Sequence, residues 1–220
     1  LRAGENHRLR GLRPDGRGGG AMNLPNKLTV FRMVLVPFFV AAVLWGGSAR
    51  HYLYAALLFA AAAYTDRLDG KLARRNNQVT DFGKFMDPLA DKVLVISALV
   101  CFVQLGLTNI WFVLLIIARE FMVTSVRLVA ADSGVVIAAN RWGKAKTVSQ
   151  ITAVLAVLLF QYWEGLISAG TLAPFSLFGI SSGGVLLWAG QAFMLVATVF
   201  TVISGIIYLK QNWNLIKTAK

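Results

Sequence analysis

Acidic residues are scarce in this sequence, and cysteine is nearly absent. Only ten Asp and Glu accompany 22 Lys and Arg in 220 residues, which gives a formal net charge of +12. The single cysteine, Cys101, excludes an internal disulfide. Charged residues make up 15% of the chain and hydrophobic residues 57%, in apolar runs too long and too numerous for the core of a soluble protein of this size. The sequence therefore predicts an integral membrane protein.

Six segments are apolar over enough of their length to enter a membrane as helices, because lipid cannot satisfy exposed backbone hydrogen-bonding groups. They are residues 28–45, 52–65 with a helical continuation through the polar stretch that follows, 83–104, 110–131, 148–167 and 185–209. We therefore predict an all-α, polytopic membrane protein with six transmembrane helices and a short interfacial segment at 22–30.

The first residues have a different composition from the rest of the chain. Residues 1–21 are rich in Arg and Gly, have little apolar content and include no hydrophobic signal region. They are expected to be a disordered leader or a cloning remnant, with a natural start at Met22. The membrane domain is accordingly assigned to residues 22–220.

Lysine and arginine are unevenly distributed among the connections between the predicted spans. One set of connections carries nearly all of them: they lie within 67–84 and 141–146, at the C-terminal end, and at Lys27 and Arg32, which are expected at headgroup level. The other set has only Arg50. Since basic loops stay in the cytoplasm, an even number of spans places both termini and residues 64–95 on the cytoplasmic side. Such a face attracts anionic headgroups and anionic substrates, so the net charge does not indicate nucleic-acid binding. The tryptophans near predicted helix ends, typical of an interfacial belt, are Trp45, Trp111, Trp163 and Trp213.

Half of the acidic residues lie in one stretch, 64–95, next to the second and third predicted spans. Asp66 and Asp69 share a face at the end of the second helix, and Asp87 and Asp91 form an i, i+4 pair at the start of the third. Four carboxylates on two antiparallel neighbours can face one another, and without a cation they would repel. Oxygen ligands suit Mg²⁺ or Mn²⁺, and two ions held by shared carboxylates support in-line phosphoryl chemistry. Asp81, in contrast, is expected to be an N-cap or a solvated loop charge.

Small residues accompany these aspartates. Gly70 and Ala73 lie on the aspartate face of the second helix, and Gly83 lies one turn before Asp87, which leaves room for a ligand to approach the backbone. Arg74 adds a planar donor suited to phosphate. The joint pattern is D-x-x-D-G-x-x-A-R, eight residues, then G-x-x-x-D-x-x-x-D. A purely structural origin for all eight positions is improbable, whereas any one of them alone would be weak.

This pattern resembles the signature of the CDP-alcohol phosphatidyltransferase family. Within that family, "NLPNKLTVFRM", "ARRNNQVTDFGKFMDPLADK", "AREF" and "GKAKT" most resemble bacterial members that act on glycerol 3-phosphate. The resemblance implies a homodimer in the bacterial cytoplasmic membrane, with two divalent cations, Mg²⁺ or Mn²⁺, held at Asp66, Asp69, Asp87 and Asp91. It also implies that Asp91 is the general base and that the cytidine diphosphate portion lies against Asp69, Gly70, Ala73, Arg74 and Gly83.

The implied reaction joins CDP-diacylglycerol to sn-glycerol 3-phosphate, releasing CMP and phosphatidylglycerol phosphate. The acceptor carries a phosphate, so a cationic pocket is needed near the metals, and its candidates are Arg119, Arg127, Lys144 and Lys146. Two simpler interpretations stay open: Arg119 pairs with Glu120 or a carbonyl, and the two lysines are ordinary charges of a cytoplasmic loop.

Other functions compete with this interpretation. The closest is a member of the same family with a different acceptor, such as inositol phosphate, serine or a phospholipid alcohol. A Mg²⁺ transporter would also place acidic residues at membrane depth, but the sequence has no internal repeat and no matching pair of broken helices. A non-catalytic membrane scaffold would not need the carboxylates.

Overall fold

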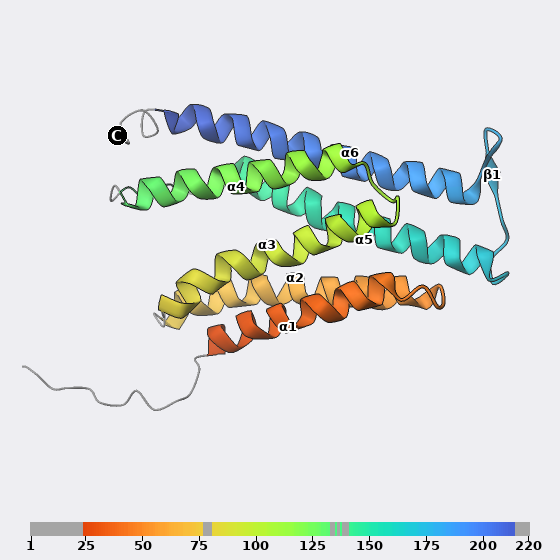
Figure 1. The fold of residues 1–220 in the computed structure, drawn as a ribbon, viewed down its shortest axis with the longest axis horizontal. Coiled ribbons are helices and arrows are strands. Elements are labelled where there is room, and N and C mark those ends of the chain that lie inside the picture. The colour runs from red at the N-terminus through yellow and green to blue at the C-terminus, as the bar shows by residue number, and fades with distance from the viewer. Residues whose placement is uncertain (1–23, 77–80, 133–134, 136, 138–140, 214–220) are drawn as a thin grey trace, which may run out of the picture.

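The computed structural model describes residues 24–76, 81–132, 135, 137 and 141–213, with the backbone alone for 24–28, 66–76, 81–91 and 132. Six helices account for most of this part of the chain (Figure 1). They are α1 (Leu24–Leu44), α2 (Arg50–Asn76), α3 (Asp81–Gln104), α4 (Ile110–Asp132), α5 (Arg141–Ser168) and α6 (Ser182–Gln211).

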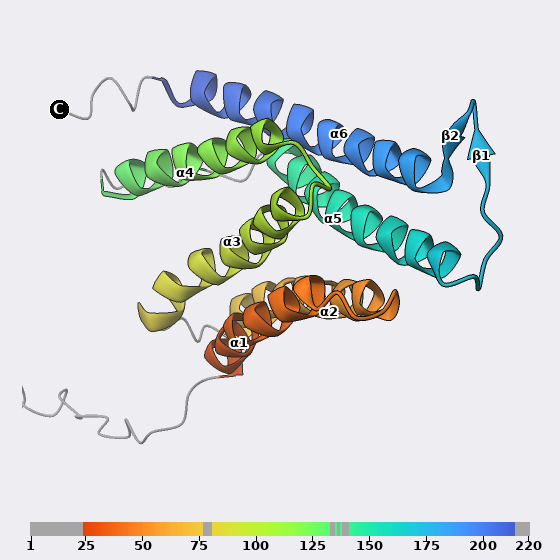
Figure 2. The same ribbon diagram turned by 45° about the vertical axis from the view of Figure 1, so that its right-hand side comes forward.

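The helices form two groups, α1 to α3 and α4 to α6 (Figure 1). Helix α1 packs against α2 and α3, α6 packs along α5 and α4, and α2 joins the groups by packing against α5. Successive helices run in opposite directions, so the start of α1, the ends of α2 and α4, the starts of α3 and α5, and the end of α6 face the same way (Figures 1 and 2). We call this the motif end of the bundle, because the aspartate-rich stretch lies there. The helix ends that flank the basic connections therefore share one end of the bundle, and its cytoplasmic orientation stays a prediction.

Aromatic and aliphatic side chains fill the space between the helices. Phe39 of α1 and Phe59 of α2 are fully buried, with ring centroids 5.7 Å apart, and Phe102 of α3 is buried in the same core. The outer surface is apolar as well: Phe38, Leu57 and Trp188, for example, are exposed. Within the described residues, α5 and α6 are each long and apolar enough to cross a membrane.

Several helices extend beyond the apolar runs that predicted them. Helix α2 continues through the polar stretch to Asn76, as expected, since Lys, Leu, Ala and Arg are good helix formers. Helix α5 begins at Arg141 rather than near Val148, so Lys144 and Lys146 lie in a helix and not in a loop. Helix α1 runs without interruption from Leu24, so the structure does not separate the predicted interfacial segment from the first span.

The connection between α5 and α6 contains a hairpin that the all-α prediction did not include. Strands β1 (Ser176–Leu177) and β2 (Ile180–Ser181) pair antiparallel at the end opposite the motif end (Figure 1). The two turn residues, Phe178 and Gly179, have φ of 52° and 78°, the positive values that two-residue hairpin turns require. Phe is an unusual residue at such a position, so this turn was not predicted from the sequence.

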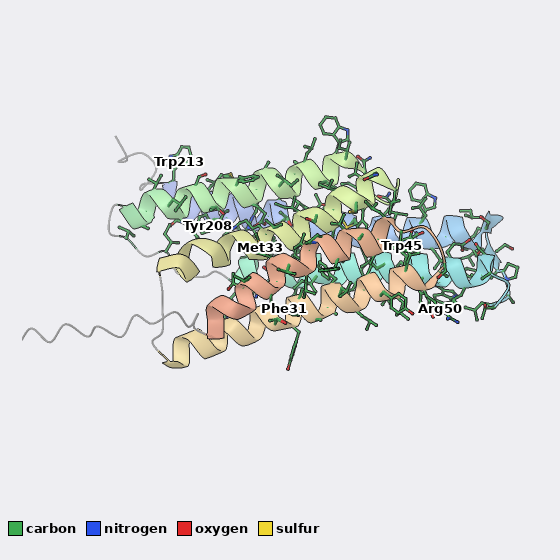
Figure 3. The ribbon with its side chains drawn as sticks, turned by 60° about the horizontal axis from the view of Figure 1, so that its bottom comes forward. Phe31, Met33, Trp45, Arg50, Tyr208 and Trp213 are labelled. Atoms are coloured by element: carbon green, nitrogen blue, oxygen red, sulfur yellow. The ribbon has the colours of Figure 1, made fainter. Side chains whose placement is uncertain are left out.

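The tryptophans lie where an aromatic belt was expected. Trp45 directly follows α1 and Trp213 closely follows α6, and both are exposed. Figure 3 shows them at opposite ends of the bundle, with Tyr208 on the side of Trp213. Trp111 at the start of α4 and Trp163 near the end of α5 are also exposed.

Candidate active site

A cavity of about 110 Å³ lies inside the bundle between α1, α2, α3, α4 and α5. Its apolar wall includes Phe59, Ala62 and Ile116. Its polar side chains come from four helices: Arg32, Lys92, Glu120, Lys146, Thr147 and Gln150. The lining is therefore mostly apolar, and its charged side chains are three cations and one carboxylate.

The cavity adjoins the two helices that carry the aspartate motif. Ala62 of α2 lines it one helical turn before position 66, and Lys92 of α3 lines it directly after position 91. Positions 66 and 91 therefore lie next to lining residues along their helices, and positions 69 and 87 lie farther along the same two helices. The side chains of Asp66, Asp69, Asp87 and Asp91 lie outside the described residues, as do those of the predicted nucleotide-binding set, Gly70, Ala73, Arg74 and Gly83.

The described side chains contain no cluster of metal ligands. Among them, no group of three or more His, Cys, Asp or Glu comes together. The side chains of the aspartate motif lie outside these residues, so its assignment as the metal site stays a prediction.

Two of the predicted phosphate-binding residues converge on one carboxylate. Glu120 Oε1 accepts from Arg119 Nη1 at 3.1 Å and also pairs with Lys146 Nζ. All three side chains are largely buried, with exposed fractions of 10% for Arg119, 14% for Glu120 and 8% for Lys146. Burial strengthens such contacts, because water screens the charges less than it does at the surface.

Arg119 reaches this cluster from behind the cavity wall. It is not among the lining residues, whereas Glu120 and Lys146 are. Its second terminal nitrogen, Nη2, donates to Ser204 Oγ of α6 at 2.7 Å. The expected alternative, a pair between Arg119 and Glu120, is therefore present, and it links Arg119 to the cavity through Glu120.

The other two predicted phosphate-binding residues lie apart from this cluster. Arg127 is exposed on α4 and stacks on the ring of Tyr208, with its guanidinium carbon 5.7 Å from the ring centroid. Lys144 is exposed on the first turn of α5. Neither lines the cavity, so within the described residues the structure brings together only Arg119 and Lys146 of the predicted four.

The sequence did not identify Arg32, Lys92 or Gln150 as site residues. Arg32 was expected at headgroup level, but it is 2% exposed and lines the cavity. A single charge within the apolar run "TVFRMVLV" was the available signal, since such a charge usually faces the interior of a bundle. Gln150 had no local signal: its place depends on a hydrogen bond from its Nε2 to Thr201 Oγ1 of α6, at 3.2 Å.

Comparison with known proteins supports the sequence-based interpretation. The family model described as CDP-alcohol phosphatidyltransferase matches residues 22–203. Three similar proteins are each named CDP-diacylglycerol--glycerol-3-phosphate 3-phosphatidyltransferase. The one from Bacillus subtilis (strain 168) is 43% identical over 208 residues, covering 90% of this chain and 98% of the relative. The one from Pseudomonas fluorescens is 36% identical over 211 residues, with 90% and 93% covered.

The third relative, from Escherichia coli (strain K12), is 44% identical over 149 residues, which cover 63% of this chain and 78% of the relative. The matched residues of the family model include the whole aspartate motif, both motif helices and the cavity lining. Together with the position of the cavity beside these helices, the match means that this chain belongs to the CDP-alcohol phosphatidyltransferase family.

Proposed function

We propose that this protein is an enzyme of phospholipid biosynthesis that transfers the phosphatidyl group of CDP-diacylglycerol to sn-glycerol 3-phosphate. The products are phosphatidylglycerol phosphate and CMP. The reaction is the one for which the similar bacterial proteins are named, and two of them match this chain over 90% of its length. The relatives' full length is nearly covered, so the likeness is not restricted to a single motif.

The observation that supports a phosphorylated acceptor most directly is the excess of cations on the cavity wall. The charged lining residues are three cations and one carboxylate, Glu120, which pairs with Lys146 and with Arg119 behind the wall. Lys146, Arg32 and Lys92 line the cavity itself, next to the motif helices. An acceptor phosphate held there would place its glycerol hydroxyl close to the carboxylates of α2 and α3.

The donor set of the motif fits two divalent cations, Mg²⁺ or Mn²⁺. Four carboxylates on two neighbouring helices supply hard oxygen ligands, and Asp66, Asp69, Asp87 and Asp91 would hold the ions. When bound, such ions neutralise the diphosphate and stabilise the charge on the leaving CMP.

The chain's own residues would bind and orient the two substrates and move one proton. Asp69, Gly70, Ala73, Arg74 and Gly83 would bind the cytidine diphosphate portion, with the small residues leaving space and Arg74 donating to phosphate oxygens. Asp91 would accept the proton of the attacking glycerol hydroxyl as the new phosphate ester forms. Lys146 would hold the acceptor's own phosphate, which limits how that hydroxyl can approach.

The protein would act as a homodimer in the bacterial cytoplasmic membrane, with six spans and with both termini and the motif end on the cytoplasmic side. One substrate is a lipid and the other is a soluble anion, so they can meet only at a membrane surface. The apolar exterior, the exposed tryptophans at both ends and the basic residues near the motif end support this placement.

An acceptor panel tests the reaction. Purified, detergent-solubilised protein with CDP-diacylglycerol and Mg²⁺ is expected to release CMP with glycerol 3-phosphate, and far less with inositol phosphate, serine or glycerol. Equal release with a non-phosphorylated alcohol would contradict the proposal, because the cationic cavity would then contribute nothing to acceptor choice.

Cysteine labelling tests the topology. In a Cys101→Ser background, Ser168→Cys at the end of α5 is expected to react with an impermeant maleimide on intact cells, and Asn77→Cys only after permeabilisation. The reverse pattern would place the motif end on the outer side of the membrane.

A further inference from the structure

The geometry points to α6 as the element that positions the acceptor-binding residues from outside the cavity. We infer that Ser204 and Gly205 position the side chain of Arg119. Arg119 then orients Glu120, and Glu120 orients Lys146 at the cavity wall. Ser204 and Gly205 are thus positioning residues for acceptor binding. This inference rests on the proposed function, since it assigns a role to residues that support the acceptor site.

Helix α6 reaches the cavity only through other side chains. The cavity lining, which belongs entirely to the described part of the chain, includes no residue of α6. Even so, α6 packs closely along both α4 and α5. Two of its buried hydroxyls face these neighbours one turn apart: Ser204 accepts from Arg119 of α4, and Thr201 accepts from Gln150 of α5.

Arg119 is fixed by the two ends of its fork. Nη1 donates to Glu120 Oε1 at 3.1 Å, and Nη2 donates to Ser204 Oγ at 2.7 Å, although Ser204 is 85 residues away in the chain. A guanidinium is planar and rigid, so fixing one nitrogen sets the direction of the other. Loss of the Ser204 bond would leave the guanidinium free to rotate away from Glu120 or to change the orientation of the Glu120 side chain.

Gly205 leaves the space through which the Arg119 side chain passes. A Cβ at position 205 would lie 2.9 Å from Arg119 Cγ and 3.3 Å from Met122 Cε. The first distance is shorter than two carbon atoms tolerate, and it involves the stem of the arginine rather than its flexible tip. A methyl group here would therefore push the guanidinium away from its present place.

A simple packing role would not require this combination. Elsewhere on α6, the buried hydroxyl of Thr198 donates to the carbonyl of Met194 in its own helix, and a Cβ added at Gly190 would lie 3.3 Å from Val157 Cγ2 of α5. These two residues resemble Ser204 and Gly205 in type and burial but have no contact with Arg119 among the described residues. Ser204 and Gly205 also lie just beyond residue 203, where the family match ends.

Steady-state kinetics with both substrates tests the inference. Ser204→Ala and Gly205→Ala are each expected to raise the KM for glycerol 3-phosphate by about 5- to 10-fold, less than the loss of a whole hydrogen bond to a charged group, because the contact of Lys146 with the acceptor is weakened and not removed. The KM for CDP-diacylglycerol should change less than about twofold, and Ser204→Thr, which keeps the hydroxyl, should restore most of the loss. The controls Thr198→Val and Gly190→Ala should leave both KM values unchanged.

A double-mutant cycle separates positioning from general destabilisation. If Ser204 acts through Arg119, Ser204→Ala should have no further effect on the acceptor KM once Arg119 is already Ala, because the bond it supports is gone. Full additivity of the two changes would overturn the inference. So would a normal acceptor KM in both α6 variants, or an equal rise of both KM values.

The outcome for Lys146 distinguishes this inference from the proposed function. A raised acceptor KM in Lys146→Ala together with normal values in Ser204→Ala and Gly205→Ala would overturn the role of α6 and leave the acceptor site standing. A normal acceptor KM in Lys146→Ala would overturn the acceptor site, and the role of α6 with it.

Discussion

The two polar regions of this protein are assembled in different ways. The aspartate motif occupies one continuous stretch of sequence that spans the end of α2 and the start of α3. The second region is the ion-pair cluster of Arg119, Glu120 and Lys146, which joins α4 to α5 and is bonded to Ser204 of α6. Its residues come from separate parts of the chain. The first region can be recognised from spacing alone, whereas the second exists only once the helices have packed.

Under the proposed function, the two regions have different roles. The carboxylates would serve the chemistry on the diphosphate, and the cations would recognise the acceptor. If the division is correct, variants of the aspartates should lower kcat, and variants of the cations should raise the KM for glycerol 3-phosphate.

The largest expected effect is at Asp87. Asp87→Asn should abolish measurable CMP release, because an amide is a much weaker ligand than a carboxylate for a hard divalent cation. Asp81→Asn is the matched control on the same helix, since Asp81 lies at the start of α3 and outside the predicted ligand set. Near-normal turnover in Asp87→Asn, or equal losses in both variants, would contradict the metal assignment.

A smaller loss is expected at Asp91. If Asp91 is chiefly the general base, Asp91→Asn should lower kcat by about 10² to 10⁴-fold. Equilibrium binding of CDP-diacylglycerol should change much less, which a competition assay with a labelled nucleotide can measure. A loss confined to lipid-nucleotide binding, with normal kcat at saturation, would remove Asp91 from the proton-transfer step.

Lys146 tests the role of the cations. Lys146→Ala should raise the KM for glycerol 3-phosphate roughly 30- to 150-fold. This factor corresponds to about 2 to 3 kcal/mol of binding free energy, within the range for hydrogen bonds to charged groups. Lys144→Ala should have a much smaller effect, because Lys144 is exposed and does not line the cavity. Equal effects would mean that the two lysines act only through the general charge of this face.

A smaller effect than that of Lys146→Ala is expected when Arg119 keeps its charge but loses its planar guanidinium. Arg119→Lys should raise the acceptor KM by about 10-fold, because one ammonium cannot reproduce two bonds to Glu120 and Ser204 in fixed directions. Arg127→Lys should change it less, since Arg127 stacks on Tyr208 away from the cavity. A larger effect at Arg127 would move the acceptor phosphate toward the outer part of α4.

Much of the helical architecture could be predicted because membrane helices are encoded by continuous apolar runs. The predicted segment 110–131 corresponds to α4, Ile110–Asp132, and 83–104 to α3, Asp81–Gln104. The main error lies at the start of α5, where polar residues extend the helix to Arg141. Polar residues of good helix propensity can extend a helix beyond its apolar run, and a prediction from hydropathy ends the helix where the apolar run ends.

The candidate site was predictable only in part, because sequence patterns show local spacing and not which helices pack together. The aspartates follow the helical spacing of one local stretch, so their pattern could be recognised before the helices were placed. The roles of Arg32 and Gln150 depend on which helices meet, and the bond between Arg119 and Ser204 joins residues 85 positions apart. No local spacing encodes such a contact.

Direct binding of glycerol 3-phosphate is the measurement that tests the division of labour most directly. Titration calorimetry on the purified protein with Mg²⁺ would compare Asp91→Asn and Lys146→Ala with the unchanged chain. We expect Asp91→Asn to bind the acceptor with nearly unchanged affinity and Lys146→Ala to bind it roughly 30- to 150-fold more weakly. Normal acceptor affinity in Lys146→Ala, with lost affinity in Asp91→Asn, would contradict the account.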